Sequence, residues 1–291
     1  IVVPAGRWRG PVVIRTSVIL QGAAGAPGSR PLSVIDGGGE GQVVRVEAAG
    51  VELRQLTIEN SGTDLSGPDA CVWIGPKATG TQVVGSHFEA CVFGIWVHET
   101  RDVQIIGNRI IGSEVGHRSL RGNGIHLFDG GNLTVSDNHV TGGRDGIYVS
   151  ATEDSLIANN HMERTRYGVH YMFSYRNTLR ANNSTGNTSG YALMESHHIV
   201  VVDNIAIDNP EHGILIRDVQ YSTIRGNHLE RNGEGLFLYS STENTVSDNR
   251  ILHNEIGAKI WAGTLRNEVR GNVFIGNRRQ IFYISAADLK W

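Results

Sequence analysis

Soft metal ligands are concentrated in one short stretch of the sequence. Residues 168–198, GVHYMFSYRNTLRANNSTGNTSGYALMESHH, contain two of the 3 methionines and three of the 12 histidines in the chain. The candidate ligands in this stretch are His170, Met172, Met194, His197 and His198. Thioether and imidazole groups together suit Cu(I) and disfavour Mg²⁺ or Ca²⁺. These side chains could therefore bind copper if the fold brings them together.

A sequence repeat of about 22 residues determines which of these residues meet. Each repeat begins with a glycine and contains an asparagine 14 residues later or nearly so. After a first interval of 30 residues, the glycines recur every 22 or 23 residues, at Gly94, Gly124, Gly146, Gly168, Gly190, Gly213, Gly235 and Gly257. The asparagines keep the same intervals, at Asn108, Asn138, Asn160, Asn182, Asn204, Asn227, Asn249 and Asn272.

Apolar residues alternate with other residue types inside each repeat. The first and third residues after the glycine are apolar or aromatic, as in Ile147 and Val149 or Tyr191 and Leu193. A period of two indicates a half-buried β-strand. Strands this short cannot each bury a core, so repeats must stack. We predict an all-β fold, a right-handed parallel β-helix (solenoid) of about twelve coils of ~22 residues, with the asparagines in a hydrogen-bonded ladder.

The repeat extends over most of the chain, so residues 1–291 are predicted to form a single β-helix domain. Two stretches exceed the repeat length, one near residues 61–69 and the other within residues 111–122. We predict that both are loop insertions on the solenoid, and loops on rigid scaffolds often carry binding elements.

Stacking would bring residues that are distant in sequence next to one another. Met172 and Met194 occupy the same outward column in adjacent turns, so their Cα atoms should be about 4.8 Å apart. His170 faces the same side two residues along the strand, roughly 6 to 7 Å from Met172. His197 and His198 follow Met194 into the next corner. The shared column of these side chains predicts a metal site.

His126 is a secondary candidate ligand, two turns from His170 and about 10 Å away. The outward columns also contain many aromatic residues, and an exposed stripe of aromatics and methionines suggests a contact surface. Methionine and aromatic side chains are enriched in protein–protein interfaces. A metal site and a metal-free interface both remain open interpretations of these columns.

Composition disfavours several other classes of protein. The 26 basic and 29 acidic residues give a net charge of −3, whereas a nucleic-acid-binding face would normally show a basic excess. No apolar run approaches the roughly 20 residues of a membrane span, so we predict that the chain does not itself cross a membrane.

Glycoside-processing enzymes with this kind of fold need clustered acids. The acids on the strand face, Glu99, Asp129, Glu195 and Asp218, are scattered, so we assign no catalytic or cofactor-binding residue and predict a protein that is not an enzyme. Cys71 and Cys91 match no zinc pattern. A disulfide between them, which would require an oxidising compartment, and two separate thiols are both open.

Four segments are characteristic beyond the repeat itself: ACVFGIWVHETRDVQIIGNRI, RYGVHYMFSYRNTLRANNSTGNTSGYALMESHHIVVVDN, HGILI and GNVFIGNRRQIFYISAADLKW. The GVHYMFS and GYALM blocks are the most specific. These segments resemble the NosD family, periplasmic β-helix proteins required for maturation of nitrous oxide reductase. The resemblance covers nearly the whole chain. It implies a periplasmic location, and it also implies that the chain is truncated at its C-terminus.

The resemblance further implies an accessory role without catalysis. Such a protein would act with an ABC transporter (permease and ATPase subunits), a copper chaperone and apo nitrous oxide reductase, and it would carry copper transiently as Cu(I). The predicted ligands rest on the outward column that holds Met172 and Met194, and not on the family resemblance. The alternatives are a metal-free scaffold in the same pathway and a β-helix protein that binds or processes polysaccharides.

Overall fold

The chain winds into a right-handed parallel β-helix of about twelve turns, which confirms the predicted fold class. This computed structural model describes the backbone of residues 1–284 and 288–290. Residues 285–287 and 291, near the end of the last segment that resembles NosD, lie outside the described residues. The chain forms two compact units, Ile1–Tyr148 and Val149–Trp291, so the single-domain organisation stays a prediction.

The first unit contains strands of three parallel sheets, named A, B and C here. Sheet A contains β1 (Val2–Val3), β4 (Ile19–Gly22), β7 (Glu52–Arg54), β10 (Gln82–Val84), β13 (Gln104–Ile106) and β16 (Thr134–Ser136). Sheet B contains β2 (Gly6–Arg9), β5 (Ser33–Asp36), β8 (Thr57–Glu59), β11 (His87–Cys91), β14 (Arg109–Gly112) and β17 (His139–Thr141). Sheet C contains β3 (Val12–Ile14), β6 (Val44–Val46), β9 (Ala70–Ile74), β12 (Phe93–His98) and β15 (Ile125–Phe128), and β18 (Ile147–Ser150) lies at the unit boundary.

The second unit repeats the same three-sheet arrangement. Its strands of sheet A are β19 (Leu156–Ala158), β22 (Thr178–Arg180), β25 (Val200–Val202), β28 (Thr223–Arg225), β31 (Thr245–Ser247), β34 (Leu265–Arg270) and β37 (Asp288–Lys290). Sheet B contains β20 (His161–Glu163), β23 (Asn183–Thr185), β26 (Ile205–Ile207), β29 (His228–Glu230), β32 (Arg250–Leu252) and β35 (Val273–Ile275). Sheet C contains β21 (Tyr167–Met172), β24 (Ser189–Met194), β27 (His212–Arg217), β30 (Glu234–Tyr239), β33 (Ile256–Ile260) and β36 (Arg279–Tyr283).

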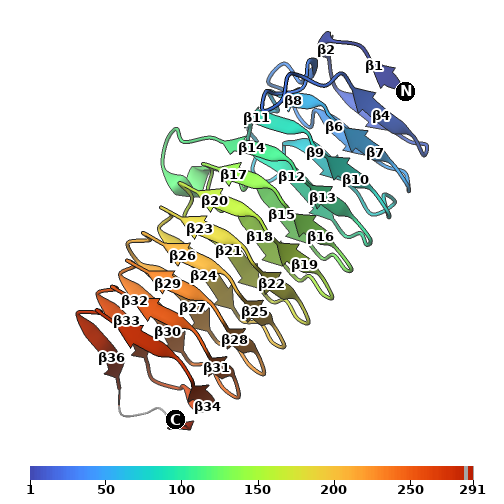
Figure 1. The fold of residues 1–291 in the computed structure, drawn as a ribbon. Helices are drawn as coiled ribbons and strands as arrows, with labels where there is room; N and C mark the ends of the chain where they lie inside the picture. The colour runs from blue at the N-terminus through green and yellow to red at the C-terminus, as the bar shows by residue number, and fades with distance from the viewer. Residues whose placement is uncertain (285–287, 291) are drawn as a thin grey trace. The chain divides into compact units, whose positions relative to one another are not determined.

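Within each unit, every third strand lies beside the last in parallel register (Figure 1). The alternation observed in the sequence accounts for the core. Ile147, Val149, Tyr191 and Leu193 are all fully buried, as are nearly all residues at the same repeat positions. The strands therefore direct these side chains inward, and the residues between them lie on the outer face of sheet C.

The predicted asparagine ladder is present. In the second unit the side-chain amide of each ladder residue donates to the carbonyl oxygen of the next at 2.8 to 3.0 Å, through Asn182, Asn204, Asn227, Asn249 and Asn272. A second ladder, which the sequence analysis missed, runs at another corner through Asn209, Asn232, Asn254 and Asn277. The residue before a ladder asparagine takes a left-handed conformation, with φ of 58°, 57° and 56° at Asp137, Asp203 and Asp248.

The two stretches longer than the repeat join strands in the first unit. Residues 60–69 connect β8 to β9, and residues 113–124 connect β14 to β15 through the short 3₁₀ helix η1 (Arg118–Leu120). Cys71 of β9 and Cys91 of β11 form a disulfide, which settles the alternative that the sequence left open. No helix in the described part of the chain has the length and hydropathy of a membrane span.

Two neighbouring core tyrosines differ in their hydrogen bonding. The hydroxyl of Tyr191 lies 2.8 Å from the carbonyl oxygen of Asn182 and 2.9 Å from that of Ile205. The hydroxyl of Tyr171, in the adjacent turn, is buried with no hydrogen-bond partner among the described residues. Burial raises the pKa of both phenols, so both stay neutral.

We expect Tyr191→Phe to lower the free energy of unfolding by about 1 kcal/mol, because buried carbonyl groups lose a donor. Tyr171→Phe should leave it unchanged or raise it, since an unsatisfied hydroxyl is removed at constant shape. Urea unfolding of the two variants provides the comparison. An equal decrease in the free energy of unfolding of both variants would mean that the Tyr171 hydroxyl has a hydrogen-bond partner in solution.

Candidate metal site

Strands β21 and β24 position the two methionines of the candidate site. The strands pair in parallel, and Met172 lies directly opposite Met194 in the register. The residues that precede them, Tyr171 and Leu193, are fully buried in the core. Because side chains alternate along a strand, both methionines are on the outer face of sheet C. The predicted column of two thioethers in adjacent turns is therefore observed.

The outer face around the methionines is more covered than the sequence alternation suggested. Met194 forms a buried apolar cluster with Ala192 and Leu215, and the partly buried side chains packed against the cluster are Tyr167, Met172 and Phe237. The predicted exposure of this stripe was wrong for Met194, which is 7% exposed. The reason is that long side chains on turns about 4.8 Å apart lie across one another.

His170 lies on the same outer face, opposite Ala192 in the register and two residues before Met172. Its ring is buried and packs edge-on against Tyr167, with ring centroids 4.9 Å apart. The guanidinium of Arg166 lies 3.5 Å from its Nδ1, at the outer limit of a hydrogen bond, and also covers the ring of Tyr167. These neighbours fix the imidazole beside the methionine column.

His197 and His198 lie in the exposed turn between β24 and β25. Glu195, with φ of 47°, begins this turn directly after Met194. The Nδ1 atoms of the two histidines are 2.9 Å apart, and their rings stack on Tyr175 and Tyr221 respectively. Burial, with the neighbouring His198 and Arg176 charges, lowers the pKa of His197, which favours a neutral ring at neutral pH.

His126 is in the first unit, whereas the other five predicted ligands are in the second. Its ring is buried against Trp96, at 3.7 Å between centroids, and its Nδ1 lies 3.1 Å from the side-chain amide of Asn123. Burial lowers the pKa of His126 to about 3, so the imidazole is neutral. These contacts account for His126 as part of an aromatic stack, and a metal role for it stays a prediction.

The donor set fits copper in its reduced state. Two thioethers in register, surrounded by apolar side chains and with an imidazole on the same face, match the preference of Cu(I) for soft ligands and low polarity. Hard cations prefer carboxylate and other oxygen ligands, and the acid that directly follows Met194, Glu195, is in the exposed turn. A copper role for these side chains stays a prediction.

The four acids considered for carbohydrate chemistry all occupy left-handed turn positions. The backbone φ angles are 50°, 50°, 47° and 55° at Glu99, Asp129, Glu195 and Asp218. Each acid is exposed at the end of a strand of sheet C. The turns that join strands account for the two aspartates, since aspartate tolerates this conformation better than most residues.

Arg166 and Tyr167 belong to the surroundings of the site but were not predicted from the sequence. They precede the repeat glycine and fall outside the alternating positions, yet they pack on His170. The residue directly before the repeat glycine varies from Phe93 to Asp145 and Ser189, so the repeat carries no signal for these two positions.

Comparison with solved structures defines the class of the protein. The fold is similar to that of DFA-IIIase from Arthrobacter chlorophenolicus A6 in complex with GF2, with a TM-score of 0.73 and 15% identity over 92% of this chain and 82% of that one. It is also similar to the A-module of the Azotobacter vinelandii mannuronan C-5 epimerase AlgE4, with a TM-score of 0.60 and 17% identity over 100% and 90% of the two chains. Residues 33–171 match the right-handed β-helix region. The chain is thus a right-handed parallel β-helix protein.

Within that class, the chain belongs to the NosD family. Residues 106–291 match the family described as periplasmic copper-binding protein (NosD). A relative from Stutzerimonas stutzeri, named probable ABC transporter binding protein NosD, is 36% identical over 304 residues, covering 99% of this chain and 68% of the relative. A relative of the same name from Pseudomonas aeruginosa is 34% identical over 301 residues, with coverage of 99% and 69%. The predicted family is confirmed.

Proposed function

We propose that this chain is a periplasmic accessory protein that carries copper and docks partner proteins during assembly of the copper centres of nitrous oxide reductase. It binds Cu(I) transiently and acts with the permease and ATPase of an ABC transporter, a copper chaperone and the apo-reductase. The observation that carries this proposal is the register of Met172 with Met194 in an apolar cluster beside His170.

Three further findings support the proposal. The family is described as periplasmic and copper-binding, and the relatives are named as ABC transporter binding proteins. The disulfide between Cys71 and Cys91 suits an oxidising compartment such as the periplasm. The outer face of sheet C carries aromatic side chains in both units, including Trp96 and Phe237, which suit a docking surface.

Two alternatives follow from particular observations. A metal-free scaffold in the same pathway is favoured by the apolar packing of Met194, which alone would account for a methionine there. A role in binding or processing polysaccharides is favoured by the fold shared with DFA-IIIase and AlgE4, although a shared fold does not transfer activity. Turnover of alginate or pectin by the purified protein would establish the second alternative.

The test of the copper proposal is a Cu(I) titration against a chromophoric chelator, performed on the unaltered chain and on Met172→Leu/Met194→Leu. Leucine has a similar volume and keeps the apolar cluster filled. We expect Cu(I) affinity to fall by at least about tenfold, because both thioethers are lost. Equal Cu(I) affinity in the double variant would leave the metal-free scaffold as the better account.

The third methionine of the chain provides the matched control. Met162 is fully buried in β20 of sheet B, so Met162→Leu removes a thioether away from the outer face of sheet C and should leave Cu(I) affinity unchanged. Two further variants, His170→Gln and His197→Gln/His198→Gln, separate the strand-face imidazole from the two in the corner turn. A loss of Cu(I) affinity in only one of these variants would identify the nitrogen ligand.

A further inference from the structure

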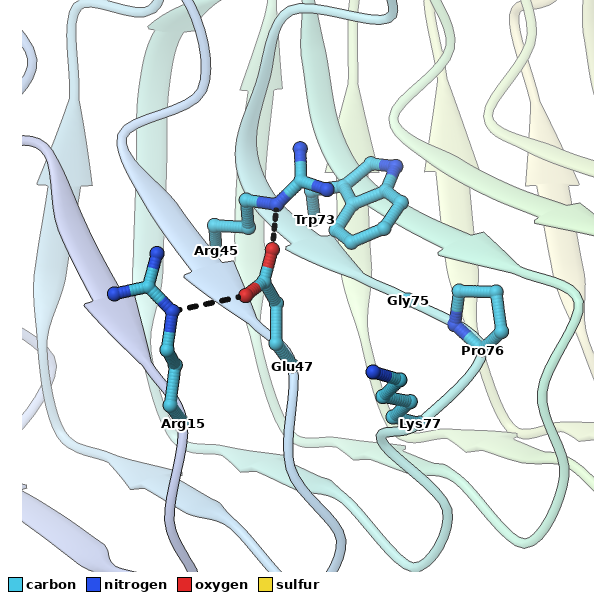
Figure 2. A pocket seen from close by; sticks show the side chains of 7 residues that line it. All are labelled: Arg15, Arg45, Glu47, Trp73, Gly75, Pro76 and Lys77. Atoms are coloured by element: carbon cyan, nitrogen blue, oxygen red, sulfur yellow. Dashed lines mark hydrogen bonds and ion pairs between the residues drawn. The ribbon is translucent and has the colours of Figure 1, made fainter.

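A hollow of about 570 Å³ lies on the outer face of sheet C in the first unit, beside β3, β6 and β9 (Figure 2). Its charged lining consists of three basic side chains and one acidic side chain, Arg15, Arg45, Lys77 and Glu47. The whole chain has a net charge of −3, so this positive site stands out from the average surface. The lining is suited to an anionic partner.

The centre of the hollow is held in place by packing. The guanidinium of Arg45 lies over the indole of Trp73, 4.1 Å from the ring centre, and also donates to Gln42 at 3.2 Å. The indole in turn lies across Gly75, where an added Cβ would be 2.2 Å from the ring. Glycine at this position is therefore required for the Trp73 orientation that supports Arg45.

Glu47 separates the two arginines. Its carboxylate accepts hydrogen bonds from Arg45 and from Arg15, the latter at 3.2 Å (Figure 2). The hydrogen bond from Arg45 is the main cause that lowers the pKa of Glu47, so this carboxylate stays ionised and orients both guanidinium groups. Only Nε of Arg15 is used in this pair, which leaves its terminal nitrogens available to a ligand.

Lys77 provides a second cation on the other side of Glu47. Its side chain extends toward the same space as Glu47 in Figure 2, and it forms no ion pair with any residue that the structure describes. Arg15, Glu47 and Gly75 follow paired strands in three successive turns. The two available cations are therefore two turns apart, on the order of 10 Å.

We propose that this hollow binds an extended acidic peptide segment of a partner protein, with one carboxylate on Arg15 and another on Lys77. An extended chain rises about 3.3 Å per residue, so acidic residues a few positions apart match the separation of the two cations. A carboxylated sugar fits less well, because Arg45 covers one face of Trp73 and the residue is only 8% exposed, leaving no open ring for stacking. The proposal rests on the docking role proposed above and names the chemistry of one docked segment.

The test is calorimetric binding of a hexapeptide of alternating glutamate and glycine, with its glutamine counterpart as the neutral probe. We expect the acidic peptide to bind at low salt, to weaken as salt is raised, and to lose at least about tenfold in affinity on Arg15→Gln/Lys77→Gln. Arg9→Gln/Arg180→Gln, which removes two exposed positive charges from other faces, should change affinity less than twofold.

Three outcomes would overturn the proposal. The first is no binding of the acidic peptide at millimolar concentration, and the second is an equal loss of peptide affinity in the two double variants. The third is tighter binding of an oligogalacturonate than of the peptide, provided that it depends on Arg15 and Lys77. The last would assign the hollow to an acidic saccharide. The result is independent of copper, because Met172→Leu/Met194→Leu lies in the second unit and should bind the peptide as the unaltered chain does.

Discussion

Leu193→Asp is expected to unfold the turns of the second unit around β24. Leu193 is fully buried and pairs in register with Tyr171 and Ile216. An aspartate there would place a carboxylate in the core, where burial of an uncompensated charge is strongly unfavourable. We expect the free energy of unfolding to fall by about 4 kcal/mol or more.

Limited proteolysis with mass spectrometry locates the damage in Leu193→Asp. Solenoid turns are stabilised mainly by their nearest neighbours, so new cleavage should concentrate between residues of adjacent turns rather than along the whole chain. Val200→Asp is the matched control, because Val200 is 40% exposed on the next strand and an aspartate there stays hydrated. Wild-type resistance in Leu193→Asp would refute the inward assignment and, with it, the outward position of Met194.

Asn204→Ala is expected to produce the second large decrease in the free energy of unfolding. Its side-chain oxygen accepts from both the backbone and the side-chain nitrogen of Asn182, and its side-chain nitrogen donates to Leu179 and Asn227. All of these groups are buried, so alanine leaves several polar groups without a partner. We expect the free energy of unfolding to fall by about 3 to 5 kcal/mol, measured by urea unfolding.

The control for the ladder is Asn183→Ala, one residue away. Asn183 is half-buried on the outer side of β23, and its side-chain oxygen accepts one hydrogen bond from Thr185 at 2.6 Å. Its replacement should cost less than about 1 kcal/mol. If both alanine variants unfold at the same urea concentration, the amide ladder contributes little to stability and the turns are held by apolar packing alone.

The sequence predicted the fold because its period is strict. Alternation at Ile147 and Val149, together with glycine and asparagine at constant intervals, specifies one strand face and one corner of every turn. Parallel stacking at one spacing then converts position in the repeat into position in space, which is why the register of Met172 with Met194 could be predicted. The left-handed residues Asp137 and Asp203 each directly precede a ladder asparagine.

Features that depend on side-chain orientation could not be predicted from the sequence period. The cover over Met194 arises from how Leu215 and neighbouring aromatic side chains lie across the face. The contacts of His170 come from Arg166 and Tyr167, which precede the strand's alternating positions. The period specifies which face a residue occupies but not the rotamer it adopts, so the ligand set stays a prediction.

Each unit carries its own kind of chemistry on the outer face of its sheet C strands. The strands of the second unit carry soft donors in apolar surroundings, and those of the first unit carry cations around Trp73. Both sites are built on strands whose backbone hydrogen bonds are satisfied by neighbouring turns. A rigid backbone of this kind allows surface side chains to change chemistry without loss of the fold, as expected where function is carried by sites rather than by architecture.

The amide ladders also bear on how such a chain can evolve. In the second unit, each bond between ladder asparagines joins identical residues 22 or 23 positions apart, as in Asn204 to Asn227 and Asn227 to Asn249. Duplication or deletion of one complete turn would therefore present every remaining amide with the same partner type. Length can change in whole-turn steps by recombination within the gene, whereas insertions of other sizes must be absorbed in connections such as residues 113–124.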